Sequence, residues 1–305
     1  MASWQASVNR FCYQYLQLEA EPSLPSPEFL KLSDAQEAIC EGAFAESVRH
    51  APPQRYQLRV LKTLVAAIAE SIDDWEEYAL SDNLMSALTM LLATPLPSEV
   101  DAAQQKCYVT YALSLIPPPA AGASQPTITL LENRSLISAG GTTGLRTWEA
   151  ALHLGQYLCE RPAIVRGKRV LELGTGTGYL SILCARHLES AHVLASDGSD
   201  DVLSNIPDNL YLNGLQEAGG TSARIAPMDL KWGHALLFAL YPGAEVYLSA
   251  TQRNHATFRV FLDACRENQL AVEDLHYGIT PQGKQTGPFY NDEVEIRVCR
   301  ISSVA

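Results

Sequence analysis

The stretch that decides the fold lies at residues 170–180, which read Val170-Leu171-Glu172-Leu173-Gly174-Thr175-Gly176-Thr177-Gly178-Tyr179-Leu180. Its first residues continue a strand pattern that begins at Arg169, and an apolar helical pattern runs from Tyr179 to about His187. Glycines at alternate positions allow a sharp turn between the two and a close approach of the backbone to a ligand. The stretch therefore predicts a strand, a ligand-binding turn and a helix.

A second strand pattern, Ala191–Ser196, follows this helix and ends on Asp197. Strand, helix and strand within about 30 residues predict a parallel βαβ unit with a right-handed crossover. Asp197 comes about 20 residues after the glycines, where a carboxylate can accept both hydroxyls of a ribose. The alternative is that Asp197 only caps a helix that begins near Asp200.

The glycine spacing favours a cofactor without a pyrophosphate. In the dinucleotide fingerprint the third glycine comes one residue later, which argues against an NAD-linked dehydrogenase. Glu172, just before the turn, suits a cofactor that carries positive charge, and the ammonium and sulfonium of S-adenosyl-L-methionine are such groups. At the end of a third strand, Ala226–Leu230, Asp229 could accept the adenine amino group and Trp232 could stack on the base. A turn carboxylate and a core aromatic are the alternatives for these two residues.

The first part of the chain has helical patterns. Apolar residues recur at three to four positions from Gln57 to Ile72, and again from Leu84 after a plausible cap region at Ser81–Asn83. The stretch Pro117–Pro126 is rich in proline and glycine and predicts a linker. We therefore expect a helical N-terminal region with its linker at 1–126, and an open α/β sheet domain at 127–305.

Charge and composition exclude several function classes. The 305 residues include 22 Lys+Arg and 34 Asp+Glu, a formal net charge of −12, which argues against direct nucleic-acid binding and favours a basic macromolecular partner. No apolar run reaches the roughly 18–20 residues of a membrane helix. The seven cysteines form no C-x-x-C pair and predict buried thiols in a reducing compartment. The histidines form no close pair at metal-ligand spacing, so we expect no metal site.

These residues resemble the lysine methyltransferases of elongation factor 2, which belong to the seven-strand S-adenosylmethionine-dependent class. The resemblance covers nearly the whole chain. The glycine turn is common to the class, whereas two motifs are more particular to the family: Arg146-Thr147-Trp148-Glu149 and Gln252-Arg253-Asn254. The runs Leu130–Ser138 and Asp229–Trp232 continue the match, and the helical N-terminal region is a family feature.

The resemblance implies a Rossmann-like α/β sheet that binds S-adenosyl-L-methionine and a cytoplasmic, monomeric enzyme that methylates a lysine of elongation factor 2. It also implies a set of cofactor-binding residues, namely Trp148, Glu172, Gly174, Thr175, Gly176, Gly178, Asp197, Asp229 and Trp232. Arg146 and Arg253 could orient the substrate, and surface ion pairs are the alternative for both.

One piece of the expected sheet is missing from the sequence. The class has the strand order 3-2-1-4-5-7-6, with strand 3 expected to end at Asp229 and strand 5 at Ala244–Ala250. A strand, a helix and their loops need roughly 25–35 residues, and only Leu230–Gly243 lies between. We expect an incomplete sheet that lacks strand 4 and the Asp-x-x-Tyr motif that ends it in the family. A skipped exon or faulty gene model would explain the gap, unless His234–Leu240 forms a makeshift strand that leaves cofactor binding impaired.

Because the missing motif carries the family's acceptor-lysine pocket, no residue of this sequence is assigned a catalytic role. The alternative function is a non-catalytic binding or assembly module, in which a degraded methyltransferase domain presents the helical region.

Overall fold

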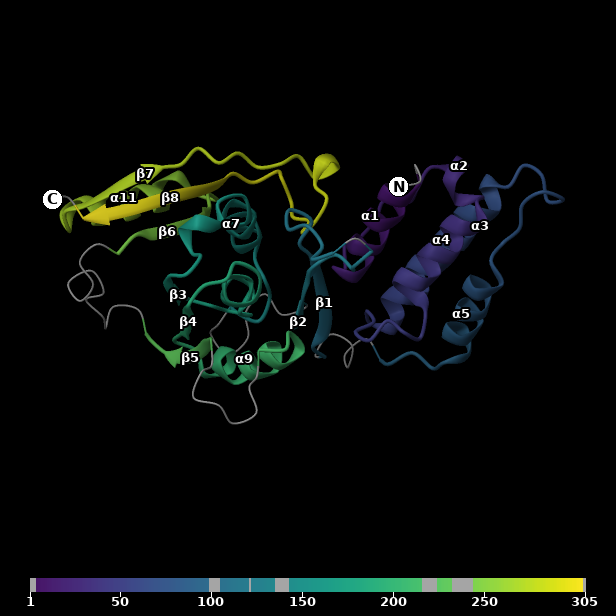
Figure 1. Cartoon of the computed structure of the whole chain (residues 1–305), viewed down its shortest axis with the longest axis horizontal. Helices are drawn as coiled ribbons and strands as arrows, with labels where there is room; N and C mark the ends of the chain where they lie inside the picture. The colour runs from purple at the N-terminus through teal and green to yellow at the C-terminus, as the bar shows by residue number, and fades with distance from the viewer. Residues whose placement is uncertain are drawn as a thin grey trace. The chain divides into compact units, whose positions relative to one another are not determined.

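The computed structural model describes residues 4–98, 105–120, 122–134, 143–215, 224–231 and 244–303. Contacts divide the chain into two units (Figure 1), and each is described here by itself. Unit 1 comprises Met1–Ser114, Pro118–Leu136 and Thr286–Phe289, and unit 2 comprises Leu115–Pro117, Ile137–Gln285 and Tyr290–Ala305.

Unit 1 is built around helices. They are α1 (Gln5–Leu16), α2 (Pro27–Leu30), α3 (Ser33–Ile39), α4 (Gln54–Ser71) and α5 (Asp82–Ala93), with a short π-helical turn at Cys40–Phe44. The predicted apolar face of α4 is buried at Leu61, Leu64 and Ile68, against Phe11 and Tyr15 of α1 among others. The cap region before α5 is confirmed, because Ser81 Oγ accepts a hydrogen bond from the amide of Leu84.

The proline-rich stretch is a hairpin connection. Strand β1 (Cys107–Ala112) pairs antiparallel with β2 (Thr127–Glu132), with Cys107 opposite Glu132 and Ala112 opposite Thr127. Both strands belong to unit 1, so the division of the structure differs from the predicted boundary between residues 126 and 127. The boundary differs because β2 pairs with β1, a strand of the N-terminal part, and not with a strand of unit 2. The sequence of a strand does not determine which strand it pairs with.

Unit 2 contains the predicted parallel unit. Helix α7 (Glu149–Glu160) precedes β3 (Arg169–Leu173), α8 (Tyr179–Ile182) with a π-helical turn at Leu183–His187, β4 (His192–Asp197), α9 (Asp200–Leu212) and β5 (Ile225–Asp229). Strands β3, β4 and β5 form a parallel sheet in that order. Helices α7 and α8 pack closely at Gly155, where a Cβ atom would lie 2.8 Å from Cε1 of Tyr179.

The rest of unit 2 forms a second sheet. It consists of β6 (Val246–Thr251), β8 (Ile296–Ser303) and β7 (Leu270–Asp274) in the order β6-β8-β7, all antiparallel, with α11 (His255–Glu267) between β6 and β7 in the chain. Short 3₁₀ turns lie at Pro162–Ile164 and Gln282–Lys284. Figure 1 shows the two three-stranded sheets as separate ribbons of unit 2.

Together the two sheets reproduce the expected seven-strand order around one gap. The series β5-β4-β3 corresponds to strands 3-2-1, and β6-β8-β7 corresponds to strands 5-7-6. Within the described residues no strand lies between β3 and β6, which is the expected place of strand 4. A salt bridge of 3.5 Å between Lys168 and Glu245 links the residues just before these two strands. The α/β fold is confirmed. The segment between Lys231 and Ala244, including the makeshift strand expected at His234–Leu240, lies outside the described residues, so the missing strand 4 stays a prediction.

Apolar surface is exposed at this gap. In β3, Leu171 is 36% exposed and Leu173 is 44% exposed, although strand 1 is a central strand in the expected order. Every residue of β6 is only half-buried, and in α11 only Cys265 is buried. Leu171 and Leu173 are apolar residues of a strand that is central in the expected order, and they lack the neighbours that would cover them.

Candidate functional site

The glycine turn after β3 has the backbone that its sequence predicts. Gly174, Gly176 and Gly178 have φ angles of 72°, 53° and 85°, in the left-handed region that side chains disfavour. A Cβ atom on Gly176 would lie 3.3 Å from the carbonyl oxygen of Gly144, so the turn is pressed against the loop before α7. Glycine is therefore required at Gly176 by its conformation and by its surroundings.

Glu172 is held at the base of this turn by hydroxyl groups. Its carboxylate accepts a hydrogen bond of 2.8 Å from Thr175 Oγ1 and another from Ser181 Oγ. Burial raises the pKa of Glu172 to about 7, the negative charge of Asp197 adds to the rise, and the two hydroxyl donors oppose it. A buried carboxyl that titrates near neutrality and lies beside a ligand-binding turn is a candidate contact for a cationic group.

Asp197 and Asp229 lie at the carboxyl ends of neighbouring strands. They are directly opposite in the β4–β5 register. The Asp197 carboxylate accepts the amide of Gly176 through Oδ2 and the amide of Ser199 through Oδ1, each at 3.1 Å. Asp197 therefore binds the start of α9, as the capping alternative expects, and also contacts the glycine turn. Asp229 is exposed at the same edge.

The segment that carries Trp148 is anchored to the glycine turn. Thr147 Oγ1 and Thr177 Oγ1 share a buried hydrogen bond of 2.7 Å. The Trp148 indole donates to the carbonyl of Thr143 at 2.9 Å, and its ring lies 4.4 Å from the Arg146 guanidinium and 5.4 Å from that of Arg253. Arg146 also makes a 3.4 Å ion pair with Glu149, which is the surface ion pair that the alternative for Arg146 predicts.

The structure brings together the predicted residues from Trp148, the glycine turn and the ends of β4 and β5, whereas Trp232 lies outside the described residues. Sequence reasoning missed the polar residues that support the turn. Thr147, Thr177 and Ser181 hold it through the contacts above, and the buried Asn209 donates to the carbonyl of Thr177 at 2.8 Å. Hydroxyl residues inside and just after the glycine motif were the available signal, because buried polar side chains need partners.

The residues at this edge suit S-adenosylmethionine. The glycines have backbone conformations that allow the sharp turn at the end of β3, Glu172 offers an acidic group to a cation, and Asp197 and Asp229 offer acceptors to hydroxyl and amino groups. The donor set therefore fits the cofactor that the sequence indicates.

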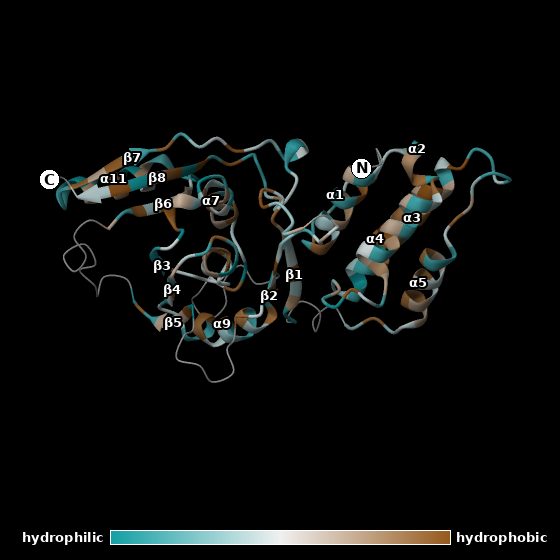
Figure 2. Ribbon diagram, in the orientation of Figure 1, coloured by the Kyte–Doolittle hydropathy of each residue, from teal (hydrophilic) through white to brown (hydrophobic). Residues whose placement is uncertain are grey.

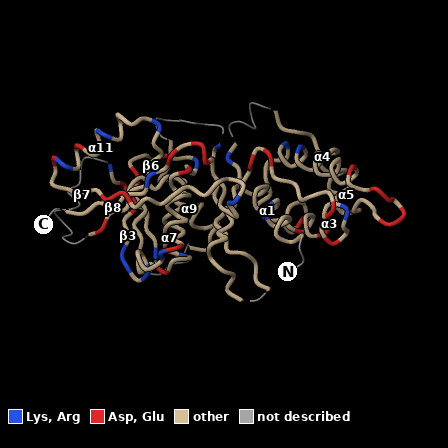
Figure 3. The backbone as a smooth tube through the Cα atoms, turned by 90° about the horizontal axis from the view of Figure 1, so that it is seen from above, with Lys and Arg blue, Asp and Glu red and all other residues tan. Residues whose placement is uncertain are grey.

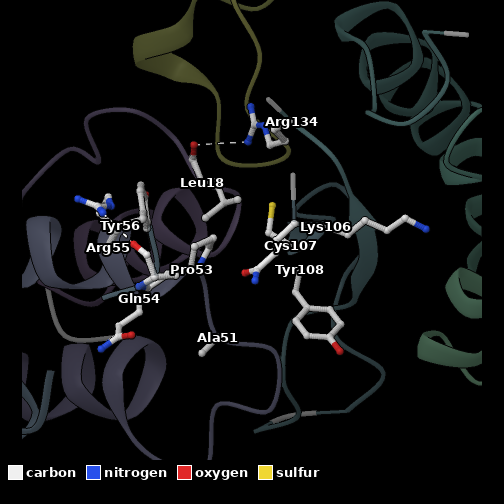
Figure 4. Close-up of a pocket in the computed structure, with 12 residues that line it drawn as sticks. Leu18, Ala51, Pro53, Gln54, Arg55, Tyr56, Lys106, Cys107, Tyr108 and Arg134 are labelled. Carbon is white, nitrogen blue, oxygen red and sulfur yellow. Dashed lines mark hydrogen bonds between the residues drawn. The ribbon is translucent and has the colours of Figure 1, made fainter. Parts of the chain in front are cut away.

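A separate cavity of about 530 Å³ lies in unit 1, away from these residues. It is formed by the start of α4, β1 and the residues after β2 (Figure 4), and Cys107, Tyr56 and Arg134 are among its lining residues. Arg134 donates to the carbonyl oxygens of Gln17 and Leu18, so it holds the backbone in place. Burial raises the pKa of Cys107 to about 11, which keeps the thiol protonated. Nothing in this cavity suggests chemistry.

The raised pKa of Glu172 predicts a pH-dependent stability that a Glu172→Gln variant lacks. Between pH 4.5 and about 7 the folded protein holds a proton that the unfolded chain has released, so Glu172 makes the protein less stable as the pH rises through this range. At about 1.4 kcal/mol for each pH unit, the loss amounts to about 3 kcal/mol. Urea unfolding at several pH values should show the variant gaining that much relative to the native chain between pH 5 and 8. The exposed control Glu267→Gln should show the same dependence of unfolding free energy on pH as the native chain. If Glu172→Gln also shows that dependence, the assignment is contradicted.

Comparison with known proteins agrees with this arrangement. A family described as lysine methyltransferase matches residues 130–248. Protein-lysine N-methyltransferase EFM3 of Chaetomium thermophilum is 45% identical over 99% of this chain and 99% of its own. Protein-lysine N-methyltransferase EEF2KMT of Homo sapiens is 32% identical, with 55% of this chain and 54% of the human protein covered.

The alignment with the C. thermophilum protein is longer than this chain. It spans 340 positions against 305 residues, so at least 35 aligned positions have no residue of this chain opposite them. That difference is the size of a strand with its following helix and loops.

Proposed function

This chain belongs to the protein-lysine N-methyltransferase family, and from that membership we propose that it transfers a methyl group from S-adenosylmethionine to a lysine of elongation factor 2. The observation that carries the proposal is the 45% identity to the C. thermophilum enzyme over 99% of both chains. The choice of elongation factor 2 rests on the resemblance of the Arg146–Glu149 and Gln252–Asn254 motifs to the family that modifies this factor. The net charge of −12 suits a substrate that presents basic surface.

In this proposal unit 2 carries the transfer and the helical unit 1 serves recognition. The amides and carbonyls of Gly174–Gly178 border the cofactor, with Glu172 below them and the Trp148 indole beside them. Asp197 accepts the ribose hydroxyls, Asp229 accepts the adenine amino group, and Trp232 stacks on the base. The seven free thiols suit a reducing compartment, and we place the monomeric enzyme in the cytoplasm.

The cofactor supplies a sulfonium methyl group that is ready for transfer. The protein must align the acceptor amine with it and exclude water, and it must receive the amine in its neutral form. An ordinary lysine has a pKa near 10.4, so an apolar collar around the acceptor has to lower it. In the family that collar belongs to the segment that ends strand 4, and for this reason no residue of the described chain is assigned as a base.

A second candidate is a non-catalytic binding module. The interrupted sheet favours it, because the described residues hold no strand between β3 and β6 and leave Leu171 and Leu173 exposed. In this alternative the chain still contacts the translation factor through unit 1, and no methyl group is transferred.

The test is to incubate the full chain with tritiated S-adenosylmethionine and elongation factor 2 of C. thermophilum, with the EFM3 protein of the same organism as a positive control. We expect label on the factor, located on a single lysine by mass spectrometry. Label transferred by the control enzyme but not by this chain would overturn the proposal. Binding of the factor without transfer would then identify the non-catalytic module.

A further inference from the structure

The acidity of this chain is concentrated in one segment of unit 1. Residues 63–105 contain no lysine, arginine or histidine, and they contribute eight of the acidic residues, so they account for −8 of the net charge of −12. The acids are Glu70, Asp73, Asp74, Glu76, Glu77, Asp82, Glu99 and Asp101. A block of one sign on a folded unit creates a local field that attracts the opposite charge.

The loop between α4 and α5 displays four of these acids around an exposed tryptophan. Asp73, Asp74, Glu76 and Glu77 are all exposed, and Trp75 between them is 59% exposed. Figure 3 shows this acidic loop next to α5. Lys31 pairs with Asp73 at 2.9 Å and is the one cation paired with the loop in the part of the chain that the structure describes. The exposed apolar surface of this tryptophan is unfavourable in water, and a cationic side chain can stack on its ring between the carboxylates.

Helix α5, which follows the loop, is apolar on more than one side. Eight of its twelve residues are apolar, yet only Leu84 is buried, and Leu88 and Leu91 are partly covered by the core. Met85 is 38% exposed and Leu92 is 56% exposed, and their spacing of seven residues places both on one side of the helix (Figure 2 shows the hydropathy along α5). An apolar side of a helix is normally covered. Flexible methionines at such a surface are typical of sites that bind peptides.

We propose that the loop Asp73–Glu77 and the outer side of α5 form an acidic docking surface for a basic, partly apolar segment of a partner protein. Lysine and arginine side chains of the partner pair with the loop acids and stack on Trp75, while its apolar side chains cover Met85 and Leu92. This surface rests on the proposed function, which gives recognition to unit 1, and it names where in unit 1 a basic partner binds; it uses none of the residues at the cofactor edge.

Charge argues against the two other occupants of such a surface. Anionic lipid and nucleic acid both require lysines and arginines on the protein, and this segment has none. Within the described residues, no helix has the length and the apolar content that a membrane crossing requires. A basic protein segment remains the occupant whose charge complements the surface.

The test measures binding of a fluorescent synthetic peptide, with lysine and leucine at helical spacing, to the full chain by anisotropy. We expect binding that weakens as NaCl is raised from about 50 to about 200 mM. The triple variant D74K/E76K/E77K and the double variant W75S/M85S should each weaken binding by about tenfold or more. Their matched controls are D208K/E267K/E293K and Y211S/V260S, which change the same charge and remove comparable exposed apolar side chains in unit 2.

The controls should bind the peptide within about twofold of the native chain, and all variants should keep its melting temperature. Equal losses in the surface variants and the controls would overturn the docking surface, since binding would then follow the total charge. Tighter binding of RNA or of phosphatidylserine vesicles than of the peptide would overturn it as well. S-adenosylmethionine binding should be unchanged in the surface variants, so a failure here is distinguishable from a failure of the proposed methyl transfer.

Discussion

Replacing residues 232–243 by the residues of the C. thermophilum EFM3 protein that align between Lys231 and Ala244 is expected to raise the melting temperature of unit 2 by roughly 10 °C. The same replacement is expected to raise methyl transfer to elongation factor 2 by at least about tenfold. Both effects follow from completing the sheet between β3 and β6.

The stability gain comes from apolar surface that is exposed in this chain. Leu171 and Leu173 of β3 are 36% and 44% exposed, and β6 has no fully buried residue. Covering one such side chain contributes about 1–2 kcal/mol, and pairing the open edges of β3 and β6 adds backbone hydrogen bonds. A net gain of a few kcal/mol remains after the entropy of ordering the added residues, and about 2–4 °C for each kcal/mol gives the expected shift.

The expected gain in methyl transfer comes from better positioning of the acceptor lysine against the donor methyl group. Strand 4 of the family ends where the donor methyl meets the acceptor lysine, and a misplacement of about 1 Å there costs about a hundredfold in rate. The control is a glycine-serine linker of equal length at the same place, which adds chain without a strand. If the linker and the family segment give the same melting temperature and the same rate, the interrupted sheet is not what limits this protein.

Local patterns predicted most of unit 2 from the sequence. The strand patterns placed β3, β4 and β5 within a residue or two, the helix expected near Asp200 begins there as α9, and the glycines of the turn have left-handed φ angles. The shortage of residues before Ala244 predicts that strand 4 is missing; the described residues hold no strand between β3 and β6, and residues 232–243 lie outside them. Counting residues against a required topology is a strong test, because a strand with its crossover has a minimum length.

Predictions that depended on contacts between residues distant in the sequence were less accurate. The pairing of Thr127–Glu132 with Cys107–Ala112 was not predicted, and so the proline-rich connection was interpreted as a linker between domains. Asp197 was assigned either a ribose contact or a helix cap, whereas its two oxygens accept amides from both the glycine turn and the start of α9. Such contacts join residues that are distant in the sequence, and periodicity carries no information about them.

Asp197 and Asp229 should therefore respond differently to substitution. We expect Asp197→Ala to weaken S-adenosylmethionine binding by about a hundredfold, or about 2.7 kcal/mol, and to lower the melting temperature by a few degrees. The affinity loss follows from a carboxylate with about four acceptor positions, of which the two amides occupy two and the ribose hydroxyls can take the others. The stability loss follows from the amides of Gly176 and Ser199, which would lose their acceptor. Asp229→Ala, at an exposed position, should weaken binding by about tenfold and leave the melting temperature unchanged.

The variant Asp197→Asn separates the two roles of this side chain. Its amide oxygen can still accept one of the two backbone amides, so the melting temperature should fall less than in Asp197→Ala, whereas the charge and an acceptor are lost to the ribose. Isothermal titration of the folded variants measures the affinities, with the exposed Asp208→Ala as the control for a lost charge on unit 2. A folded Asp197→Asn protein with native affinity would limit Asp197 to capping α9 and holding the turn. The ribose would then have to be bound from elsewhere, and Asp229, opposite Asp197 in the β4–β5 register, would be the next carboxylate to test.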